Sequence, residues 1–321
     1  MNTIGFPGFN IGPFEINSIA FSVFGLSISW YGIIVTLGML TAIFYSFRIS
    51  QKREGISSDD MMDVAIFSIP AAIIGARAYY VIFNWGNFNT LGSIFNTRQG
   101  GLAIYGGLIF AVAACFGVCK FKKLSFLKVT DAVTPGILIG QIIGRWGNFT
   151  NAEAFGTATE LPWRMSIFGV GEVHPTFLYE SLWNLLGFVA ISLIYKHKKF
   201  DGLIFLIYVS WYGLGRMLIE GLRTDSLMLG DFRVSQVFGG LCLVGGIILI
   251  IYLASQYKIR LLASDPTYKP TYSQALAKIT EADAEREQAL GGAAEPEQAA
   301  EEPEMPDELG EEPEAAGERD E

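Results

Sequence analysis

The chain has 321 residues, of which 51% are hydrophobic and 17% charged, and its formal net charge at pH 7 is −9. Such a high apolar content excludes an ordinary soluble domain. The negative charge is local, because residues 281–321 hold 17 acidic and two basic residues while the preceding 280 residues carry a net charge of +6. Neither an acidic tail nor bases placed beside apolar runs indicates nucleic-acid binding.

The apolar runs predict an all-α, polytopic membrane protein with seven transmembrane helices, since each run approaches the ~20 residues that a spanning helix needs. Residues 1–20 contain two prolines and neither lysine nor arginine, and we expect them to form an extracytoplasmic lead-in. A membrane domain of seven spans follows over residues 21–262. The expected spans are 21–47, 61–83, 102–119, a fourth that begins after Lys128 and ends near Arg145, then 175–195, 203–219 and 234–257.

The loop charges predict the orientation of these spans. Lysine and arginine gather after spans one, three, five and seven, at Arg48, Lys52, Arg53, Lys120, Lys122, Lys123, Lys128, Lys196, Lys198, Lys199, Lys258 and Arg260. The opposite connections hold only Arg98, Arg164, Arg223 and Arg233. By the positive-inside rule, the N-terminus is outside and the C-terminus is cytoplasmic.

Residues 265–321 are rich in Ala, Glu, Pro and Gln and contain few large apolar residues. This composition predicts an acidic, low-complexity cytoplasmic tail that is disordered. The simplest interpretation is a solvated tail without chemistry, and docking to a basic partner is the alternative. The three cysteines lie within apolar runs and form neither a disulfide framework nor a metal-binding pattern.

The stretch Gly144–Glu153, with the sequence GRWGNFTNAE, stands at the outward end of the fourth span. An ionised arginine at membrane depth costs at least ~3 kcal/mol unless it pairs with an acid, snorkels or faces water. Arg145 therefore indicates a functional site. Arg77 of the second span brings another guanidinium group to the same outward half of the bundle.

The sixth span carries Tyr212, Arg216 and Glu220 at intervals of four residues, which puts all three side chains on one face of the helix. Together with Arg145, this series gathers planar donor groups at one side of the membrane. Guanidinium groups arranged in this way favour a ligand that bears phosphate.

Each feature also has a structural interpretation. Arg216 and Glu220 could form an ion pair that only neutralises itself, and the glycine pairs Gly100-Gly101 and Gly106-Gly107 could serve tight helix packing alone. His174, which precedes Pro175, could be a cap or a hydrogen-bonded structural residue, although it is also a candidate acid or base.

The pattern Gly144-Arg145-x-Gly147-Asn148-Phe149-x-Asn151-x-Glu153 resembles the signature of the bacterial prolipoprotein diacylglyceryl transferases. Further agreement comes from Trp30-Tyr31-Gly32, the segment from Gly100-Gly101 to Gly106-Gly107, His174-Pro175 through Tyr179-Glu180, and Tyr212-x-x-x-Arg216-x-x-x-Glu220. The resemblance covers about residues 15–262 and leaves out the acidic tail.

This resemblance implies a multi-pass protein of the bacterial cytoplasmic membrane, with its active site toward the extracytoplasmic face. The implied reaction moves the sn-1,2-diacylglyceryl group of phosphatidylglycerol onto the lipobox cysteine thiol of a preprolipoprotein, the first step of lipoprotein maturation. A thioether forms and glycerol phosphate leaves. The implied partners are phosphatidylglycerol, lipobox-containing preprolipoproteins and the lipid bilayer, and no metal or organic cofactor is implied.

The resemblance also implies roles for particular residues. The expected catalytic residues are Arg145, Arg216, Tyr105 and Glu220, with the two arginines holding the charge of the departing phosphate and Glu220 orienting Arg216. The attacking sulfur must be a thiolate, and nearby arginines can lower its pKa without a dedicated base. The expected substrate-binding residues are Tyr31, Arg77, Asn148, Asn151, Glu153, His174 and Tyr212.

Tyr105 departs from the family pattern. In the best-known members this position, between the two glycine pairs, is a histidine that is often discussed as a base. A tyrosine with a pKa of about 10 is a poor base at neutral pH. Either Tyr105 works beside an arginine, or it binds and orients the substrate without accepting a proton, which is the interpretation we favour.

A lipid or anion transporter that uses the arginine cluster is the alternative function from another class. Transporters commonly show internal repeats and polar groups at the membrane midplane. This sequence shows no convincing repeat, and its polar groups collect on one side. A catalytically inactive scaffold is a third reading, which the intact motif disfavours.

Overall fold

The computed structural model describes residues 1–88, 90–97, 100–230, 232–264 and 285. Seven helices in this part of the chain are long and apolar enough to cross a membrane, as predicted. They are α1 (Trp30–Ile49), α2 (Ser58–Phe83), α4 (Ile104–Lys122), α5 (Phe126–Asn151), α6 (Thr176–Ile194), α7 (Leu203–Ile219) and α8 (Val234–Ala263). A short helix, α3 (Leu91–Phe95), lies in the connection between α2 and α4.

Short helical turns extend or link these elements. A π turn, η2 (Ser50–Glu54), continues α1, and the 3-10 turns η4 (Tyr195–His197) and η5 (Glu220–Leu222) continue α6 and α7. The turns η1 (Pro7–Phe9) and η3 (Trp85–Asn87) lie outside the spans. These extensions carry charged residues beyond the regular helices, so they matter for both ends of the bundle.

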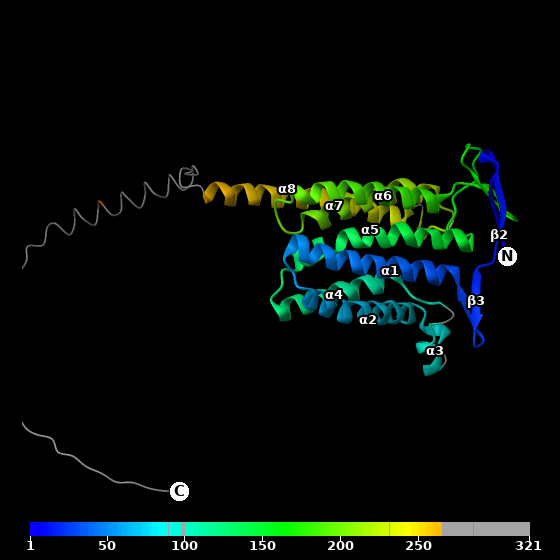
Figure 1. The fold of residues 1–321 in the computed structure, drawn as a ribbon, viewed down its shortest axis with the longest axis horizontal. Coiled ribbons are helices and arrows are strands. Elements are labelled where there is room, and N and C mark those ends of the chain that lie inside the picture. The colour runs from blue at the N-terminus through cyan, green and yellow to red at the C-terminus, as the bar shows by residue number, and fades with distance from the viewer. Residues whose placement is uncertain (89, 98–99, 231, 265–284, 286–321) are drawn as a thin grey trace, which may run out of the picture. The chain divides into compact units, whose positions relative to one another are not determined.

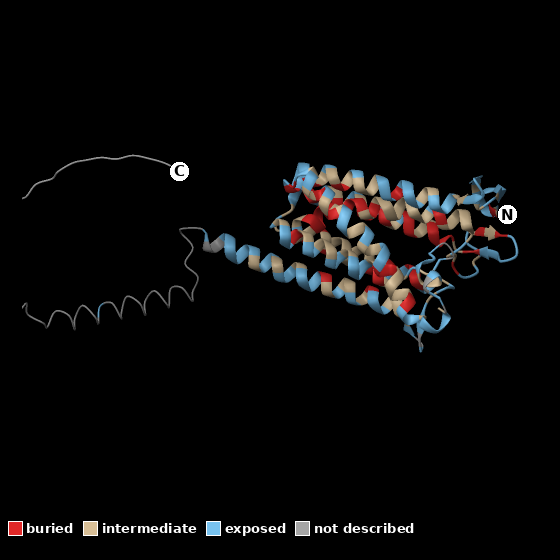
Figure 2. Ribbon diagram, turned by 90° about the horizontal axis from the view of Figure 1, so that it is seen from below, coloured by how far each residue is buried: buried red, intermediate tan, exposed pale blue. Residues whose placement is uncertain are grey.

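The central helix of the bundle is α5. It packs against α1 on one side and against α6 and α7 on the other, while α2 and α4 form a hairpin of their own (Figure 1). Buried residues follow the interior of the bundle, and the outer faces are exposed (Figure 2). One core cluster joins Leu138 of α5, Ile191 of α6, Tyr195 of η4 and Ile204 of α7.

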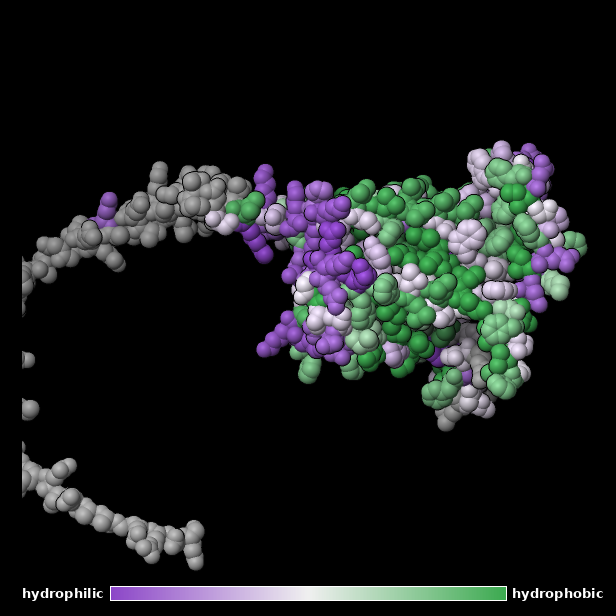
Figure 3. Space-filling model, viewed as in Figure 1, coloured by the Kyte–Doolittle hydropathy of each residue, from purple (hydrophilic) through white to green (hydrophobic). Residues whose placement is uncertain are grey.

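The outer faces of the helices are hydrophobic. Phe44, Ile74, Leu186 and Leu241 are each more than half exposed although they belong to spanning helices. Figure 3 shows these hydrophobic side chains as a band across the middle of the visible face, with hydrophilic side chains gathered most densely at the end away from the β-strands. A surface of this kind suits contact with acyl chains rather than with water.

Glycine allows α2 and α4 to pack closely against each other in their hairpin. A methyl group at Gly106 of α4 would collide with the backbone of Gly75 and with Tyr79, both on α2. Gly106 therefore serves close approach of two helices, the structural interpretation offered for this glycine pair.

The first 29 residues are more ordered than a lead-in of irregular chain. Strand β1 (Asn2–Phe6) pairs with β2 (Ile11–Ile16) and with β5 (Met165–Ile167), and β5 pairs with β6 (Gly171–Val173), so the sheet order is β2-β1-β5-β6. A hairpin of β3 (Ile19–Val23) and β4 (Leu26–Ser29) then leads into α1, and β7 (Met228–Leu229) pairs with β8 (Phe232–Arg233) before α8. The first span consequently begins at Trp30, not at residue 21.

The sheet is anchored to the ends of two spanning helices. Ile4 of β1 is fully buried in a cluster with Met165, Ile167 and Phe177, and Phe149 of α5 packs against the same cluster. This contact fixes the polar connection between α5 and α6 over the end of the bundle that holds the motif GRWGN of residues 144–148. The chain from Met1 to Arg260 forms one compact unit. Apart from Glu285, the predicted tail, 265–321, lies outside the described residues.

Candidate active site

A cavity of 160 Å³ lies where α5, α6 and α7 meet the first residue of α4. Its walls combine apolar side chains with several of the charged residues that the sequence predicts to act together. The lining residues are Ile104, Gln141, Arg145, Glu180, Trp183, Asn184, Tyr212, Gly215, Arg216 and Ile219. The predicted residues Arg145, Tyr212 and Arg216 therefore share one cavity.

Glu180 of α6 is the centre of an ion-pair network. Its side chain is only 8% exposed. Oε2 pairs with Arg145 and lies 3.8 Å from Nη1 of Arg216, while Oε1 accepts a hydrogen bond of 3.1 Å from Arg223. Three arginines thus share one buried carboxylate, which compensates part of their charge inside the bundle.

The face of α7 predicted from the four-residue spacing exists. Nε of Arg216 donates to the Tyr212 hydroxyl at 3.1 Å, and Nη1 donates to Oε2 of Glu220 at 2.9 Å. The Glu220 side chain is 4% exposed, and its backbone carbonyl accepts a hydrogen bond from Arg233. The backbone of Glu220 is thus held by Arg233, and its buried carboxylate bonds to Arg216, as an orienting role toward Arg216 requires.

Two tryptophans fix the helix that carries Glu180 relative to the helix that carries Arg216. Trp183 of α6 and Trp211 of α7 stack at 4.3 Å between ring centroids. Each indole N–H donates to the other residue's backbone carbonyl, at 3.1 Å and 3.0 Å. Both rings lie against glycines, Gly187 and Gly215, where a methyl group would collide with the indole. This reciprocal clamp sets the position of α6 relative to α7.

The chain reverses direction at the end of α5 and brings Glu153 back to Asn148. Ala152 adopts a left-handed conformation with φ of 52°, and the Glu153 backbone N–H bonds to the Asn148 carbonyl at 3.1 Å. Nδ2 of Asn148 then donates to Oε1 of Glu153 at 2.9 Å, and Oδ1 of Asn148 lies 3.5 Å from Nη1 of Arg145. Arg145, Asn148 and Glu153 thus form a chain of contacts that begins at the cavity.

Other predicted residues lie around this centre without joining its ion pairs. Tyr31 packs on Gly147, where a methyl group would come within 2.9 Å of the ring. Tyr105 contacts Phe238 of α8 edge to face at 6.2 Å, one residue after the cavity-lining Ile104. His174 shares a 3.2 Å hydrogen bond with the Tyr179 hydroxyl, and Asn151 is the half-buried last residue of α5.

Arg77, a predicted substrate-binding residue, directs its guanidinium group toward the connection that follows its own helix. Its guanidinium donates five hydrogen bonds to backbone carbonyls, those of Ser93, Ile94, Asn96, Gly100 and Gly101. The aromatic rings of Tyr80 and Phe88 flank it at 5.7 and 5.2 Å from their centroids. Because all of its donors are used in this way, we now expect Arg77 to hold the α2–α4 connection.

Three residues at or beside the cavity were absent from the predicted site residues. Glu180 belongs to a segment that agrees with the family pattern but has no predicted role, and Arg223 is considered only as a charge in a connection between spans. Arg223 follows Glu220 by three residues, so continuing the helical spacing of Tyr212, Arg216 and Glu220 by one step would have found it. The third is Gln141, whose Nε2 donates to the Tyr208 hydroxyl at 2.8 Å while its buried Oε1 has no partner among the described residues.

Arg223 is held from two sides. Besides Glu180, it binds Asp225 through two hydrogen bonds of 2.9 and 2.7 Å. The hydrogen bonds from Arg223 hold the pKa of the Asp225 carboxyl below its ordinary value. Asp225 therefore stays ionised and keeps Arg223 at the edge of the network.

The arginines retain free donors for an anion. Within the described part of the chain, Nε of Arg145 and Nη2 of Arg216 make no hydrogen bond, and both side chains line the cavity. An oxyanion that enters can thus be met by guanidinium N–H groups from two helices. Over the same residues, no three His, Cys, Asp or Glu side chains are grouped as a metal site would need.

Comparison with known proteins gives an independent result. Residues 18–252 match the family model described as prolipoprotein diacylglyceryl transferase. A protein of Finegoldia magna named phosphatidylglycerol--prolipoprotein diacylglyceryl transferase is 48% identical over 252 residues, which are 78% of this chain and 99% of that protein. Proteins of the same name from Clostridioides difficile and Listeria innocua are 46% identical over 244 residues and 43% identical over 253 residues. Those alignments cover 76% and 75% of this chain and 98% and 91% of the two proteins.

Proposed function

Because the chain belongs to the prolipoprotein diacylglyceryl transferase family, we propose that it transfers the diacylglyceryl group of phosphatidylglycerol to a preprolipoprotein. The acceptor is the thiol of the lipobox cysteine, and the product is a thioether in the first step of lipoprotein maturation. The alternative of a lipid or anion transporter is not favoured, since the named relatives are transferases.

The observation that carries this proposal is the pair of guanidinium groups at one cavity, from Arg145 of α5 and Arg216 of α7. In the reaction the sulfur forms a bond to a glyceryl carbon, the bond from that carbon to the phosphate oxygen breaks, and glycerol phosphate leaves with both electrons. Donors fixed at the leaving oxygen stabilise the charge as it develops. Arg145 and Arg216 supply these donors, and Glu220 holds Arg216 in position.

Glu180 orders the arginine side chains before the substrate binds. Its carboxylate shares Arg145, Arg216 and Arg223, so the guanidinium groups are already ordered before phosphate arrives. Donors that are fixed in advance lose little entropy when they bind the transition state. Glu180 therefore acts as a positioning residue, and Asn148 and Glu153 do the same for Arg145.

The thiol must lose its proton before or during attack. Positive charge from the arginines favours the thiolate, so the reaction needs no side chain devoted to proton removal. Tyr105 contacts Phe238 from the first turn of α4, and we assign it a role in orienting the substrate. The expected roles of Tyr31, Asn151, His174 and Tyr212 in substrate binding are part of the same proposal.

We also propose the orientation and the compartment. The lysines and arginines that follow spans one, three, five and seven support a cytoplasmic position for that end of the bundle in a bacterial cytoplasmic membrane. The arginine cavity then opens on the extracytoplasmic half. There the enzyme would meet phosphatidylglycerol of the outer leaflet together with the membrane-inserted lipobox segment.

The test is direct. Purified protein in nanodiscs that contain phosphatidylglycerol is mixed with a lipobox peptide, and the mass gain of a diacylglyceryl thioether is followed. A peptide with serine in place of the cysteine is the control. Absence of the thioether under conditions where a known relative produces it would reject the proposal.

A further inference from the structure

The end of the bundle opposite the arginine cavity carries a second cavity, of 370 Å³. It lies between the end of α1, the start of α5 and the turn after α6. Lys128 and Arg145 stand at the two ends of α5, and 17 residues of helix place them about 25 Å apart. Six basic and two acidic residues line this cavity together with Tyr195 and Phe200: Lys52, Arg53, Lys128, Lys196, Lys198, Lys199, Glu54 and Asp201.

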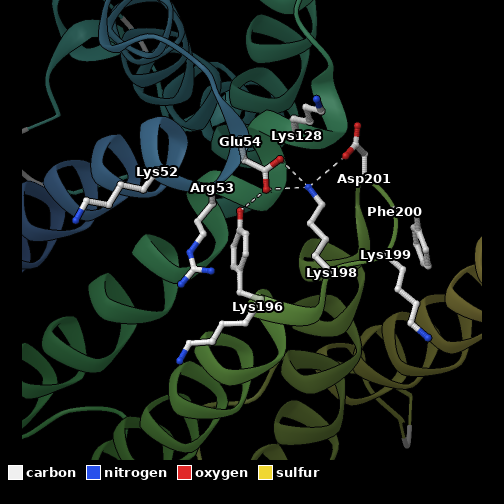
Figure 4. A pocket seen from close by; sticks show the side chains of 10 residues that line it. Lys52, Arg53, Glu54, Lys128, Lys196, Lys198, Lys199, Phe200 and Asp201 are labelled. Carbon is white, nitrogen blue, oxygen red and sulfur yellow. Dashed lines mark hydrogen bonds and ion pairs between the residues drawn. The ribbon is translucent and has the colours of Figure 1, made fainter.

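One base, Lys198, pairs with all three acids at or beneath this cavity. Nζ of Lys198 lies 2.7 Å from Glu54, 2.9 Å from Asp131 and 3.3 Å from Asp201. Asp131 is fully buried and also accepts the backbone N–H groups of Gly202 and of Phe205 in the first turn of α7, while Glu54 accepts the Tyr195 hydroxyl at 2.7 Å. Figure 4 shows the Lys198 ammonium between Glu54 and Asp201, with Lys52, Arg53 and Lys196 on one side and Lys199 on the other.

The other five bases are left without an acid. Among the described residues, Lys52, Arg53, Lys128, Lys196 and Lys199 form no ion pair. The guanidinium of Arg53 is instead held over the Tyr195 ring, 6.0 Å from its centroid. Counting the buried Asp131, six bases face three carboxylates, and this excess of three positive charges gives the pocket the electrostatics of an anion site.

A third cavity, of 330 Å³, adjoins this basic pocket and has the opposite chemistry. The two share Arg53, Tyr195 and Lys196 in their linings. The remaining walls are almost entirely apolar and come from three helices: Tyr45 and Ile49 of α1, Pro135 of α5, and Phe188, Val189, Ser192 and Leu193 of α6. Leu193 is 60% exposed, so this groove opens on the hydrophobic surface of the bundle.

One polar atom in the apolar groove has no partner. Oγ of Ser192 is buried, and no described residue bonds to it. A hydroxyl without an acceptor in an apolar wall is costly, unless the occupant of the groove supplies one. The ester carbonyl of a glycerolipid is such an acceptor, and it would lie between a phosphate and an acyl chain.

We propose that the basic pocket and the adjoining groove form one binding site for an anionic phospholipid of the cytoplasmic leaflet. Arg53, Lys52 and Lys196 hold the phosphate, Ser192 donates to an ester carbonyl, and an acyl chain lies along Tyr45, Phe188 and Leu193. A soluble phosphate would use the basic pocket but not the groove, and the continuity of the two cavities is why we assign a lipid. The site is separate from the one that transfers the diacylglyceryl group.

The test uses a phosphatidylglycerol carrying a diazirine near the end of one acyl chain, with the full-length protein in nanodiscs made otherwise of phosphatidylcholine. After irradiation, mass spectrometry locates the label. We expect labelling of residues 188–193 that is at least ~5-fold stronger than with the matched phosphatidylcholine probe. Excess unlabelled phosphatidylglycerol should compete for it, whereas water-soluble glycerol phosphate should not.

Two variants and one control make the test specific. R53Q/K196Q removes the phosphate contacts, and Ser192→Leu fills the groove, so each should lower the labelling of residues 188–193 at least ~5-fold. K120Q/K123Q removes as many charges from unpaired bases at the same end of the bundle but outside the pocket, and labelling should persist. An unchanged midpoint of thermal unfolding in all three variants reports that they are folded.

The proposal is overturned if the phosphatidylcholine probe labels this segment as strongly as the anionic one, or if K120Q/K123Q lowers the labelling as much as R53Q/K196Q. Competition by glycerol phosphate would instead identify a site for soluble phosphate. Because the labelling does not depend on turnover, a failure here leaves the proposed transferase activity intact, and the reverse also holds.

Discussion

Arg145 lies in α5 and Arg223 follows the turn η5 after α7, and the two meet on the two oxygens of one carboxylate, that of Glu180. Arg216 approaches the same group at 3.8 Å. This shared acid means that the arginines cannot be treated as independent charges. Replacing any one of them changes the electrostatic interaction of the other two with Glu180.

Replacement of Glu180 should therefore damage both stability and activity. Glu180→Gln leaves three neighbouring guanidinium groups with less negative charge, and breaking a buried ion pair by removing one partner costs about 3 kcal/mol. We expect a lower midpoint of thermal unfolding in detergent and a slower rate of thioether formation. Glu172→Gln is the matched control, because Glu172 pairs with Arg164 at an exposed position. A Glu180 variant as stable as the control would show that the network does not hold the bundle.

Arg216 tests whether a planar donor group is required or only a positive charge. Arg216→Lys keeps the charge but loses the simultaneous contacts to Tyr212 and Glu220. We expect Arg216→Gln to lower kcat by at least ~100-fold, as removal of a donor to a developing oxyanion does. The lysine variant should recover only part of this loss. Full activity of Arg216→Lys, measured by initial rates of thioether formation, would contradict a role for the guanidinium fork.

The sequence predicted those parts of the fold and site that depend on local pattern. Apolar runs bounded by bases gave the spans, and the four-residue spacing gave the contacts among Tyr212, Arg216 and Glu220. The first helix was placed nine residues early because the hairpin before it is apolar too. Its turn, Phe24-Gly25, has positive φ at both residues, but Phe at that place is uncommon and gives no signal. The better signal was Ser29, whose side chain caps the helix.

Glu180 and Arg77 could not be assigned in the same way, since their roles depend on how distant segments pack. Glu180 meets Arg145 only because α5, α6 and α7 come together. Arg77 meets its five carbonyls only because the connection after α2 folds over it. A sequence shows which charged residues lie in a span, and it does not show which partner each will find.

The contacts of Arg77 lead to a prediction that separates a structural role from substrate binding. Arg77→Gln removes most of the hydrogen bonds to the α2–α4 connection, and we expect it to destabilise the protein by about 3 kcal/mol. Gly101→Ala should act similarly, because Gly101 has φ of 80° and a methyl group there would collide with the guanidinium. The KM for phosphatidylglycerol of the folded fraction should change little. A raised KM without loss of stability would restore the original prediction that Arg77 binds the substrate.

Tyr105 can be tested by changing only its hydroxyl. Tyr105→Phe keeps the edge-to-face contact with Phe238 but cannot transfer a proton. We expect this variant to retain most of its activity, and Tyr105→His to show no large gain. If the phenylalanine variant is inactive while the histidine variant is active, the position does participate in proton transfer. The comparison uses rates of thioether formation over a range of pH.

The buried base at the other end of the bundle leads to a prediction about stability and pH. Burial alone would lower the pKa of Lys198, but the carboxylates of Glu54 and Asp131 outweigh it and raise the pKa above its ordinary value of 10.5. The ammonium is more strongly held in the folded state, so its contribution to stability is complete below the ordinary pKa and is lost only as pH rises through the raised value.

Lys198→Met leaves Glu54 and Asp131 buried without their cation, which should cost about 3 kcal/mol. The gap in the midpoint of thermal unfolding between the two proteins should therefore persist as pH rises to about 9. Lys199→Met, at the exposed neighbouring residue, should behave like the unchanged protein, and equal destabilisation by both substitutions would mean that the ion cluster around Lys198 contributes nothing of its own.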